Sequence, residues 1–280
     1  MDGTNCTTCS DRDNGRCNTG QCSGSPILPQ NDASDIKQVI AVMSGKGGVG
    51  KSSVSSLLAI ALARRGRRVG ILDADITGPS IPKLFGLLAR PEQFKNYILP
   101  VKTSLGIQVM SLNLFLPQED DPVVWRGPIL SSAVKQFWTD VAWGELDYLI
   151  VDMPPGTGDV PLTVMQSLPL DGLVVVSSPQ DLAMMVVGKT IKMARQAAIP
   201  ILGLVENMSY ITCPHCGEKI QPFGNGDLRE EAGKRGLPVL AVLPVDPELA
   251  KLADDGRIED YAETSLHNLG PLVELVEKNY

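Results

Sequence analysis

The stretch Gly45-Lys46-Gly47-Gly48-Val49-Gly50-Lys51-Ser52 decides the fold, because it matches the phosphate-binding pattern G-x-x-x-x-G-K-[ST]. The apolar run 39–43 before it predicts a buried strand. Residues 52–65 after it have helical periodicity that ends before Gly66, which is typical of a helix C-terminus. A strand, a glycine-rich loop and a helix in this order predict a P-loop nucleotide site. The alternative, a chance glycine-rich turn, does not explain this order.

The loop has the chemistry that a polyphosphate requires. Its glycines let the backbone surround an anion without Cβ clashes, so that N–H groups and the helix N-terminus point at the phosphates. We expect Lys51 to reach the β- and γ-phosphates of ATP and the Ser52 hydroxyl to bind Mg²⁺. The predicted nucleotide contacts in the loop are Gly45, Lys46, Gly47, Gly48, Val49, Gly50, Lys51 and Ser52.

Carboxylates follow two further apolar runs. Asp73 ends the run 69–73, Asp75 stands two residues after it, and Asp152 ends the run 148–152. The carboxyl ends of parallel strands face the crevice where ligands bind. Asp152 is therefore the predicted Mg²⁺ carboxylate, holding the ion through water, and Asp75 the predicted residue that orients the attacking water. Asp73 fits a structural role better, and a helix N-cap is the alternative for Asp75 and Asp152.

The rest of the chain alternates in the same way. Apolar runs at 172–176, 201–205 and 238–243 are separated by helical patterns such as 182–198 and 227–235. This alternation predicts an α/β fold with a doubly wound, mostly parallel sheet. We expect one P-loop ATPase domain over residues 36–280. Residues 1–35 are polar, contain four cysteines and predict a short cysteine-containing N-terminal segment and linker.

Composition narrows the classes of protein. The chain has 280 residues, 43% of them hydrophobic, and a net charge of −7, which argues against a broad basic surface for nucleic acid. No apolar run reaches the roughly 18 residues of a membrane-spanning helix, and the N-terminus lacks a signal-peptide pattern. We therefore expect a cytoplasmic protein without membrane or nucleic-acid partners. In that reducing compartment, six cysteines favour metal ligands or reactive thiols over disulfides.

Lys46 adds a second cation near the start of the loop. The pattern Lys46-Gly47-Gly48-Val49-Gly50-Lys51 resembles the variant loop of the ParA/MinD-like ATPases, P-loop NTPases of the SIMIBI type. In that superfamily the extra lysine reaches the nucleotide of a partner subunit. The resemblance thus implies a homodimer in which Lys46 is catalytic, because a second cation offsets charge developing at the γ-phosphate. A solvated loop lysine is the alternative.

Longer motifs make the resemblance specific. In order along the chain they are 45–52, Asp73-Ala74-Asp75-Ile76-Thr77-Gly78-Pro79-Ser80, Trp125-Arg126-Gly127-Pro128, 143–159, Val205-Glu206-Asn207-Met208-Ser209 and Cys213-Pro214-His215-Cys216-Gly217. Together they closely resemble the Mrp family of iron–sulfur cluster carriers. The resemblance implies a homodimer that hydrolyses ATP slowly and delivers a [4Fe–4S] cluster to apo-proteins. It also implies that Asn207, Pro244 and Asp246 lie near the adenine. It gives Arg126 no role.

The pair Cys213-x-x-Cys216 supplies two thiolates, whereas a [4Fe–4S] cluster or a Cys₄ zinc site takes four. A twofold dimer brings two such pairs together and completes the set. We therefore predict that Cys213 and Cys216 bridge a [4Fe–4S] cluster across the dimer. A zinc knuckle or unligated thiols are the alternatives, and His215 is most simply a spacer.

The N-terminal cysteines form a second set of four. Cys6, Cys9, Cys17 and Cys22 supply four thiolates from one chain, enough for a second [4Fe–4S] cluster or for a zinc ion. Some members of the resembled family carry an N-terminal four-cysteine cluster, but the spacing here differs from their eukaryotic pattern. An iron–sulfur cluster, zinc and an unfilled site therefore all stay open.

A MinD/ParA-like switch for protein positioning is the competing function, since it uses the same ATPase core. Such proteins end in a basic amphipathic helix that binds membranes. Here residues 266–280 contain two glutamates, one lysine and the pair Gly270-Pro271, a poor match to an anionic membrane surface. A nitrogenase-reductase-like electron donor also bridges one cluster, but its cysteines lie far apart in sequence. Cluster carriage is therefore the preferred reading.

Overall fold

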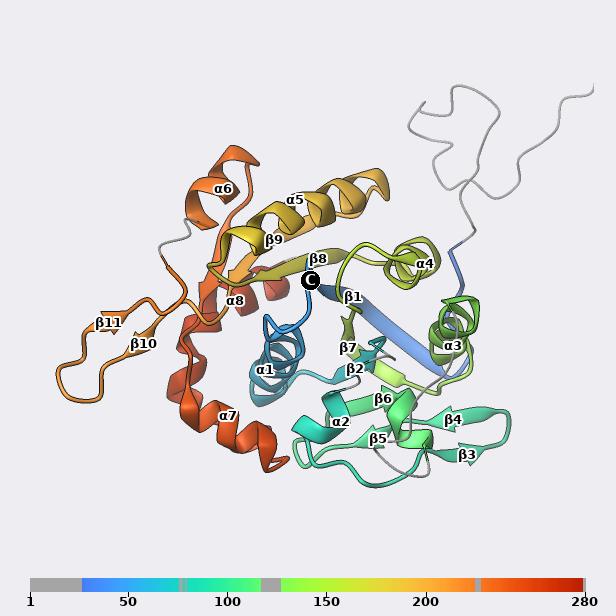
Figure 1. The fold of residues 1–280 in the computed structure, drawn as a ribbon. Helices are drawn as coiled ribbons and strands as arrows, with labels where there is room; N and C mark the ends of the chain where they lie inside the picture. The colour runs from blue at the N-terminus through green and yellow to red at the C-terminus, as the bar shows by residue number, and fades with distance from the viewer. Residues whose placement is uncertain (1–26, 76–77, 79, 117–126, 225–227, 279–280) are drawn as a thin grey trace, which may run out of the picture.

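The structure is a computed structural model and describes residues 27–75, 78, 80–116, 127–224 and 228–278 (Figure 1). The four N-terminal cysteines and Arg126 lie outside these residues. Among the described helices, none is long and apolar enough to cross a membrane.

One eight-stranded sheet forms the centre of the molecule, in the order β12-β9-β8-β1-β7-β2-β6-β5. All neighbouring strands pair in parallel except β5 and β6, which are antiparallel. The strands are β1 (Ser34–Ser44), β2 (Val69–Asp73), β5 (Val101–Lys102), β6 (Gln108–Ser111), β7 (Gly144–Asp152), β8 (Gly172–Ser177), β9 (Ile201–Glu206) and β12 (Val239–Val242). This order confirms the predicted doubly wound, mostly parallel sheet.

Helices cover both faces of the sheet, so the protein has three layers (Figure 1). On one face lie α1 (Lys51–Arg64), α2 (Ile81–Leu84), α7 (Pro247–Asp254), α8 (Gly270–Lys278) and the 3₁₀ turns η3 (Ile258–Asp260) and η4 (Glu263–Leu269). On the other lie α3 (Gly127–Thr139), α4 (Asp159–Ser167), α5 (Asp181–Gln196) and α6 (Leu228–Lys234). Each face therefore has its own apolar core.

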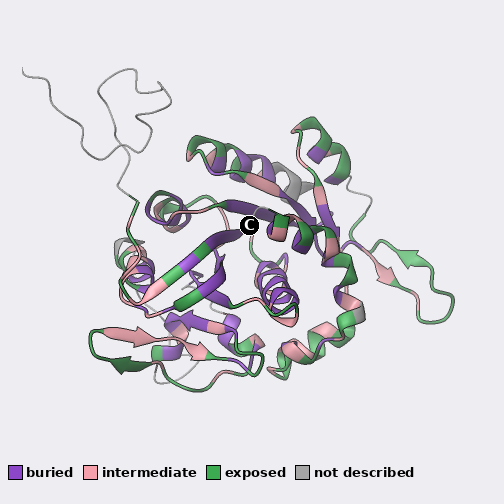
Figure 2. Ribbon diagram, turned by 180° about the vertical axis from the view of Figure 1, so that it is seen from behind, coloured by how far each residue is buried: buried purple, intermediate pink, exposed green. Residues whose placement is uncertain are grey.

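Burial explains why the strand runs read as continuously apolar. Figure 2 shows the central strands buried along most of their length. Every residue of β8 is buried, and so is every residue of β7 from Leu146 to Asp152. Strands covered on both faces need no alternation of polar and apolar side chains. Asp152, fully buried at the end of such a strand, therefore needs a polar partner.

Short elements depart from the predicted series. The hairpins β3 (Glu92–Phe94)–β4 (Tyr97–Leu99) and β10 (Ile211–Thr212)–β11 (Lys219–Ile220), and the strands β5 and β6, have no counterpart in it. Each has two to four residues, too few for a clear period. At the other end of the chain, α8 buries Leu272, Val273 and Val276 against the core instead of presenting them to solvent.

The described residues before β1 are tied to the domain. Leu28 N–H donates to Ser167 O, and Trp138 Nε1–H donates to Leu28 O, both over less than 3 Å. Asn31 Nδ2 donates to the carbonyls of Thr139 and Val141. Residues assigned to the linker thus hold a fixed place beside α3, while the division at residue 35 stays a prediction.

Candidate nucleotide site and cysteine hairpin

The glycine-rich loop leaves the carboxyl end of β1 and enters α1 at Lys51. Gly48 and Gly50 have φ angles of 78° and 75°, in the left-handed region that favours glycine. Gly50 is also the N-cap of α1, so the first N–H groups of the helix open toward the loop. A cleft lies over them, and its lining includes Gly47, Gly48, Ser52, Asp75 and Pro155. These are features of an anion site.

Asp152 is the centre of the polar cluster under this cleft. Its Oδ2 lies 2.6 Å from Lys51 Nζ and accepts from Ser52 Oγ at 2.7 Å, while Oδ1 accepts from Ser55 Oγ at 2.6 Å. Lys51 and Asp152 are both buried, the aspartate completely. The structure thus brings together three predicted site residues, Lys51, Ser52 and Asp152. Ser55 was missed, although its position one turn after Ser52 places it on the same helix face.

Two more carboxylates lie beside this cluster. Asp75 Oδ2 is 3.7 Å from Lys51 Nζ. Asp73 accepts hydrogen bonds from Asp75 N–H at Oδ1 and from Ser111 Oγ at Oδ2, each over 3.1 Å. Burial, with the nearby Asp152 charge, raises the pKa of Asp73 to about 8. Asp73 therefore anchors the strand end, and Asp75 is the carboxylate of this pair that lines the cleft.

The donor set fits a magnesium ion. The ammonium of Lys51, itself a cation, lies among Ser52 Oγ, Asp152 Oδ2 and Asp75 Oδ2, at 3.3, 2.6 and 3.7 Å. Mg²⁺ prefers oxygen ligands and takes one or two carboxylates together with phosphate oxygens and water. This set has two carboxylates and one hydroxyl. A group of three or more His, Cys, Asp or Glu side chains placed to hold a metal is absent from the described part of the chain.

Lys46 lies on the outer part of the loop. Its Nζ donates to Gln180 Oε1, and Ser44 Oγ donates to the Lys46 carbonyl at 2.9 Å. It is partly exposed and is separate from the buried cluster around Asp152. Within one protomer, Lys46 therefore contacts the residue before α5, and Gln180 is a neighbour that no sequence pattern indicated.

Asn207 joins the loop to the other half of the sheet. Its Nδ2 donates to Val49 O at 2.9 Å, and its backbone N–H donates to Ser177 O at 2.8 Å. A Cβ on Gly50 would lie 2.2 Å from Asn207 Nδ2, so glycine is required there for this contact as well as for its φ angle. Asn207, placed near the adenine by family resemblance, is in contact with the phosphate loop.

The segment with Pro244 and Asp246 runs next to Asn207. Leu243 N–H donates to Glu206 O at 2.7 Å, so Pro244 follows directly after this contact. Asp246 caps α7 by accepting from Glu248 N–H, and its Oδ2 accepts from Tyr261 Oη at 2.6 Å. Burial and Asp246 raise the pKa of the Tyr261 hydroxyl. Asp246 thus has a structural role at the start of α7 beside its predicted one.

Cys213 and Cys216 occupy the turn of the β10–β11 hairpin, which projects from the body of the molecule (Figure 1). Cys213 N–H donates to Glu218 O, and Gly217 N–H, at a φ of 76°, donates to Cys213 O. Cys213 is partly exposed, and Cys216 is exposed. Backbone N–H groups of Cys216 and His215, followed by the Cys216 side chain, lower the pKa of the Cys213 thiol. The turn therefore favours a thiolate at Cys213.

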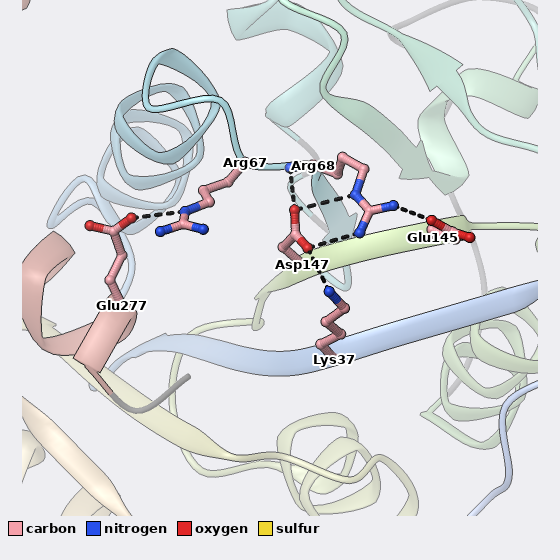
Figure 3. A network of polar contacts seen from close by, with 6 residues as sticks. All are labelled: Lys37, Arg67, Arg68, Glu145, Asp147 and Glu277. Atoms are coloured by element: carbon pink, nitrogen blue, oxygen red, sulfur yellow. Dashed lines mark hydrogen bonds and ion pairs between the residues drawn. The ribbon is translucent and has the colours of Figure 1, made fainter.

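A second charged network lies near the starts of the parallel strands, at the end of the sheet away from the nucleotide cleft (Figure 3). Asp147, near the start of β7, accepts from Arg68 Nη2 at 2.9 Å, from Arg68 N–H at 2.9 Å and from Lys37 Nζ at 3.2 Å. Arg68 also contacts Glu145, and Arg67 Nε donates to Glu277 at 2.9 Å. The hydrogen bond from the Arg68 guanidinium is the main cause that holds the pKa of Asp147 well below its usual range. This network joins β1, β7 and the start of β2.

Comparisons with known proteins find similarity over most of the chain. Residues 35–276 match the family described as ParA: NUBPL iron-transfer P-loop NTPase. The iron-sulfur cluster carrier protein of Clostridium perfringens is 45% identical, over 94% of this chain and 97% of that protein. The protein of the same name from Methanocaldococcus jannaschii is also 45% identical, over 82% of each chain.

Solved structures show the same fold. A nucleotide-binding protein from Archaeoglobus fulgidus, in complex with ADP and with cobalt, is 48% identical with a TM-score of 0.73, covering 81% of this chain and 89% of that one. The cell division ATPase MinD of Pyrococcus furiosus is 21% identical with a TM-score of 0.60, over 87% of this chain and 99% of that one, a likeness of fold alone. The match over 35–276 confirms the predicted resemblance, and the chain belongs to the NUBPL iron-transfer P-loop NTPase family.

Proposed function

We propose that this protein is an ATP-hydrolysing carrier that binds a [4Fe–4S] cluster as cargo and delivers it to apo-proteins. One observation carries the proposal: a partly exposed and an exposed thiol stand on a projecting hairpin that begins four residues after Asn207, a residue bonded to the phosphate loop. Relatives that are 45% identical are named iron-sulfur cluster carrier proteins, which supports the same cargo here.

The nucleotide side of the proposal follows from the cluster around Asp152. On ATP binding, the Lys51 ammonium turns from Asp152 toward the β- and γ-phosphates, because their negative charge attracts it. Ser52 and Asp152 would then hold Mg²⁺, Ser52 through its hydroxyl and Asp152 through water. Bound there, Mg²⁺ would neutralise negative charge on the phosphates.

Asp75 and Lys46 complete the proposed catalytic set. Asp75 lines the cleft and orients the attacking water, a role that requires a carboxylate near the γ-phosphate. Lys46 lies on the outer side of the loop, where it is accessible to a second copy of the chain. In a homodimer it offsets the charge that develops on the partner's γ-phosphate during slow hydrolysis.

The cysteine side requires two protomers. Each hairpin offers Cys213 and Cys216, and four thiolates from two copies complete the ligand set of a [4Fe–4S] cluster. The lowered pKa of Cys213 favours the ligating thiolate. Because both thiols are at the surface of one protomer, a cluster between two hairpins stays within reach of an acceptor's cysteines. Cys6, Cys9, Cys17 and Cys22 remain a predicted second site for a cluster or zinc.

Anaerobic reconstitution with ferrous iron and sulfide tests the proposal. The wild type is expected to gain absorption near 410 nm, to hold about four irons per dimer in the bridging site, and to activate an apo-acceptor. The variant Cys213→Ser/Cys216→Ser should lose that cluster and the transfer. The matched control Cys6→Ser/Cys9→Ser keeps the bridging site and should keep transfer. Transfer by Cys213→Ser/Cys216→Ser at the wild-type rate would overturn the proposal.

A further inference from the structure

The outer edge of β12 forms a groove that the nucleotide and cysteine sites do not use. β12 is the last strand on its side of the sheet, and β9 is its partner strand among the described residues. The four consecutive residues Val239–Val242 all line the groove. Side chains of a strand alternate between faces, so a groove that touches four in succession follows the strand edge. A strand edge carries backbone N–H and C=O groups that can pair with another extended chain.

Positive charge borders this edge. Lys219 of β11 and Arg229 of α6 line the groove, and none of its described lining residues is an aspartate or glutamate. Lys219 Nζ lies 4.1 Å from the centre of the Tyr210 ring, which fixes its ammonium beside the groove. The whole chain carries a net charge of −7, so this is a local reversal of sign. An acidic segment is the complement of such a border.

The groove also lies at the base of the cysteine hairpin. Tyr210 and Lys219, which belong to or adjoin the two hairpin strands, form part of its lining. A segment paired with β12 therefore runs beside the elements that present Cys213 and Cys216. The opposite edge of the sheet differs, because β5 has only two residues. Of the two sheet edges, β12 is the one long enough to pair with a peptide of several residues.

We propose that the β12 edge is a docking site for an extended, acidic segment of an apo-protein that receives the cluster. The segment adds a strand beside β12, with main-chain hydrogen bonds for affinity and Lys219 and Arg229 for charge selection. This proposal rests on the proposed function, since it assigns the partner of the cysteine hairpin. It also makes a binding claim that is measured without any cluster.

A labelled peptide tests the binding claim on the full-length protein. The probe is acetyl-Glu-Val-Glu-Val-Glu-Val-amide with a fluorescent label, followed by anisotropy at two salt concentrations. We expect saturable binding that weakens with salt, and at least a tenfold loss of affinity for Lys219→Glu/Arg229→Glu. Arg90→Glu/Lys102→Glu, which makes the same charge change at two residues outside the groove lining, is the control and should bind like the wild type. Equal affinity for the groove variant would overturn the proposal.

A second peptide separates strand pairing from charge attraction alone. Methylation of alternate amide nitrogens keeps every charge but removes the N–H groups that a strand uses, so this peptide should bind at least tenfold more weakly. Equal binding of the two peptides would contradict a β-strand docking mode. Sedimentation is measured in parallel, because peptide-driven dissociation of a dimer would show instead that the edge joins two copies of this chain.

Cluster transfer then links the groove to the acceptor. With reconstituted protein and a fixed apo-acceptor, the unmethylated peptide should slow transfer, and Arg229→Glu should raise the acceptor concentration needed for half-maximal transfer at least threefold. If neither the peptide nor Arg229→Glu changed the rate of transfer or its dependence on acceptor concentration, the docking role would be overturned while the carrier function stands. A wild type that binds the peptide but transfers no cluster would instead contradict the proposed function and leave the peptide site intact.

Discussion

The two ends of strand β7 each carry an aspartate, and their surroundings differ. Asp147, near the start, meets Arg68 and Lys37, so two cations face its carboxylate (Figure 3). Asp152, at the end, meets Lys51, which also faces Asp75, and lies beside the buried Asp73. Near the start of β7, the Asp147 carboxylate thus faces two cations. At the carboxyl ends of the strands, Asp152 and Asp75 share one lysine.

The pKa shifts express the same difference. Near the start of β7, Arg68 lowers the pKa of Asp147, which stabilises the charged form. At the end of β2, burial and Asp152 raise the pKa of Asp73 to about 8, because another negative charge is unfavourable there. A network with balanced charge stabilises the fold, while an excess of buried carboxylates is typical of a site that takes a cation and a nucleotide. The predictions below separate these two roles.

The largest expected effect is that of Lys51→Ala. Removing the ammonium that reaches the phosphates should lower the rate of ATP hydrolysis by about 10²–10³-fold. Phosphate release at saturating ATP measures the loss. Lys37→Ala is the matched control, because it removes a lysine from the Asp147 network, and it should hydrolyse ATP at the wild-type rate. Full activity in Lys51→Ala would show that the phosphate site is misassigned.

Asp152→Asn should have the next largest effect, on the response to magnesium. If Asp152 holds the ion through water, its loss costs about 10–100-fold in metal affinity or activity. A Mg²⁺ titration of hydrolysis at fixed ATP reports the shift, and circular dichroism checks the fold. Asp147→Asn removes the carboxylate at the other end of the strand. An equal shift in that variant would mean that the two ends do not differ as described.

Asp147→Asn should act on stability instead. Losing charge-assisted hydrogen bonds to Arg68 and Lys37 should lower the free energy of unfolding by about 1–3 kcal/mol. The folded-state pKa of Asp147 is below its unfolded value of about 3.9, so the contribution is present above that pH and is lost as pH falls through the folded-state pKa. Urea unfolding at neutral and acidic pH should show a difference from wild type that shrinks on acidification. A constant difference would contradict the ion-pair explanation.

The smallest effect is expected at Gly66, which follows the C-terminus of α1 at the same end of the sheet as Asp147. Its φ of 79° is strained for alanine, although a Cβ there meets no atom within 4 Å. Gly66→Ala should cost about 1 kcal/mol, and Gly66→Asn less, because asparagine tolerates this conformation better. Thermal unfolding measures both. The rate of ATP hydrolysis should be unchanged. A loss of activity in Gly66→Ala would show that this end of the sheet also affects the nucleotide site.

Much of the fold was predictable because its strands are buried on both faces. The predicted run 69–73 coincides with β2, and the predicted helix 52–65 differs from α1 by one residue at each end. The polar cluster was predictable in part, since Lys51, Ser52 and Asp152 belong to a motif and a strand end. Ser55 could have been added from its helical spacing to Ser52, whereas Ser111 and Gln180 could not, because their contacts join distant segments through tertiary packing.

The hairpin shows a different limit. Cys213-x-x-Cys216 indicated a ligand pair, but the strands of its hairpin have two residues each and carry no periodic signal. The hairpin lies beside the edge of β12 because of the path of the chain after Asn207. Tertiary hydrogen bonds such as Val245 N–H to Tyr210 O determine this path. The short path from Val49 through Asn207 to Cys213 is therefore a result of the structure alone.

The rate of cluster transfer with and without ATP tests most directly whether the phosphate loop governs the cysteine hairpin. Reconstituted wild type and Lys51→Ala are mixed anaerobically with an apo-acceptor, with ATP and Mg²⁺ or with neither. The wild-type rate should change when nucleotide is added, whereas Lys51→Ala should transfer at one rate in both conditions. A wild type that ignores ATP, or a Lys51→Ala variant that responds as the wild type does, would contradict the coupling of the two sites.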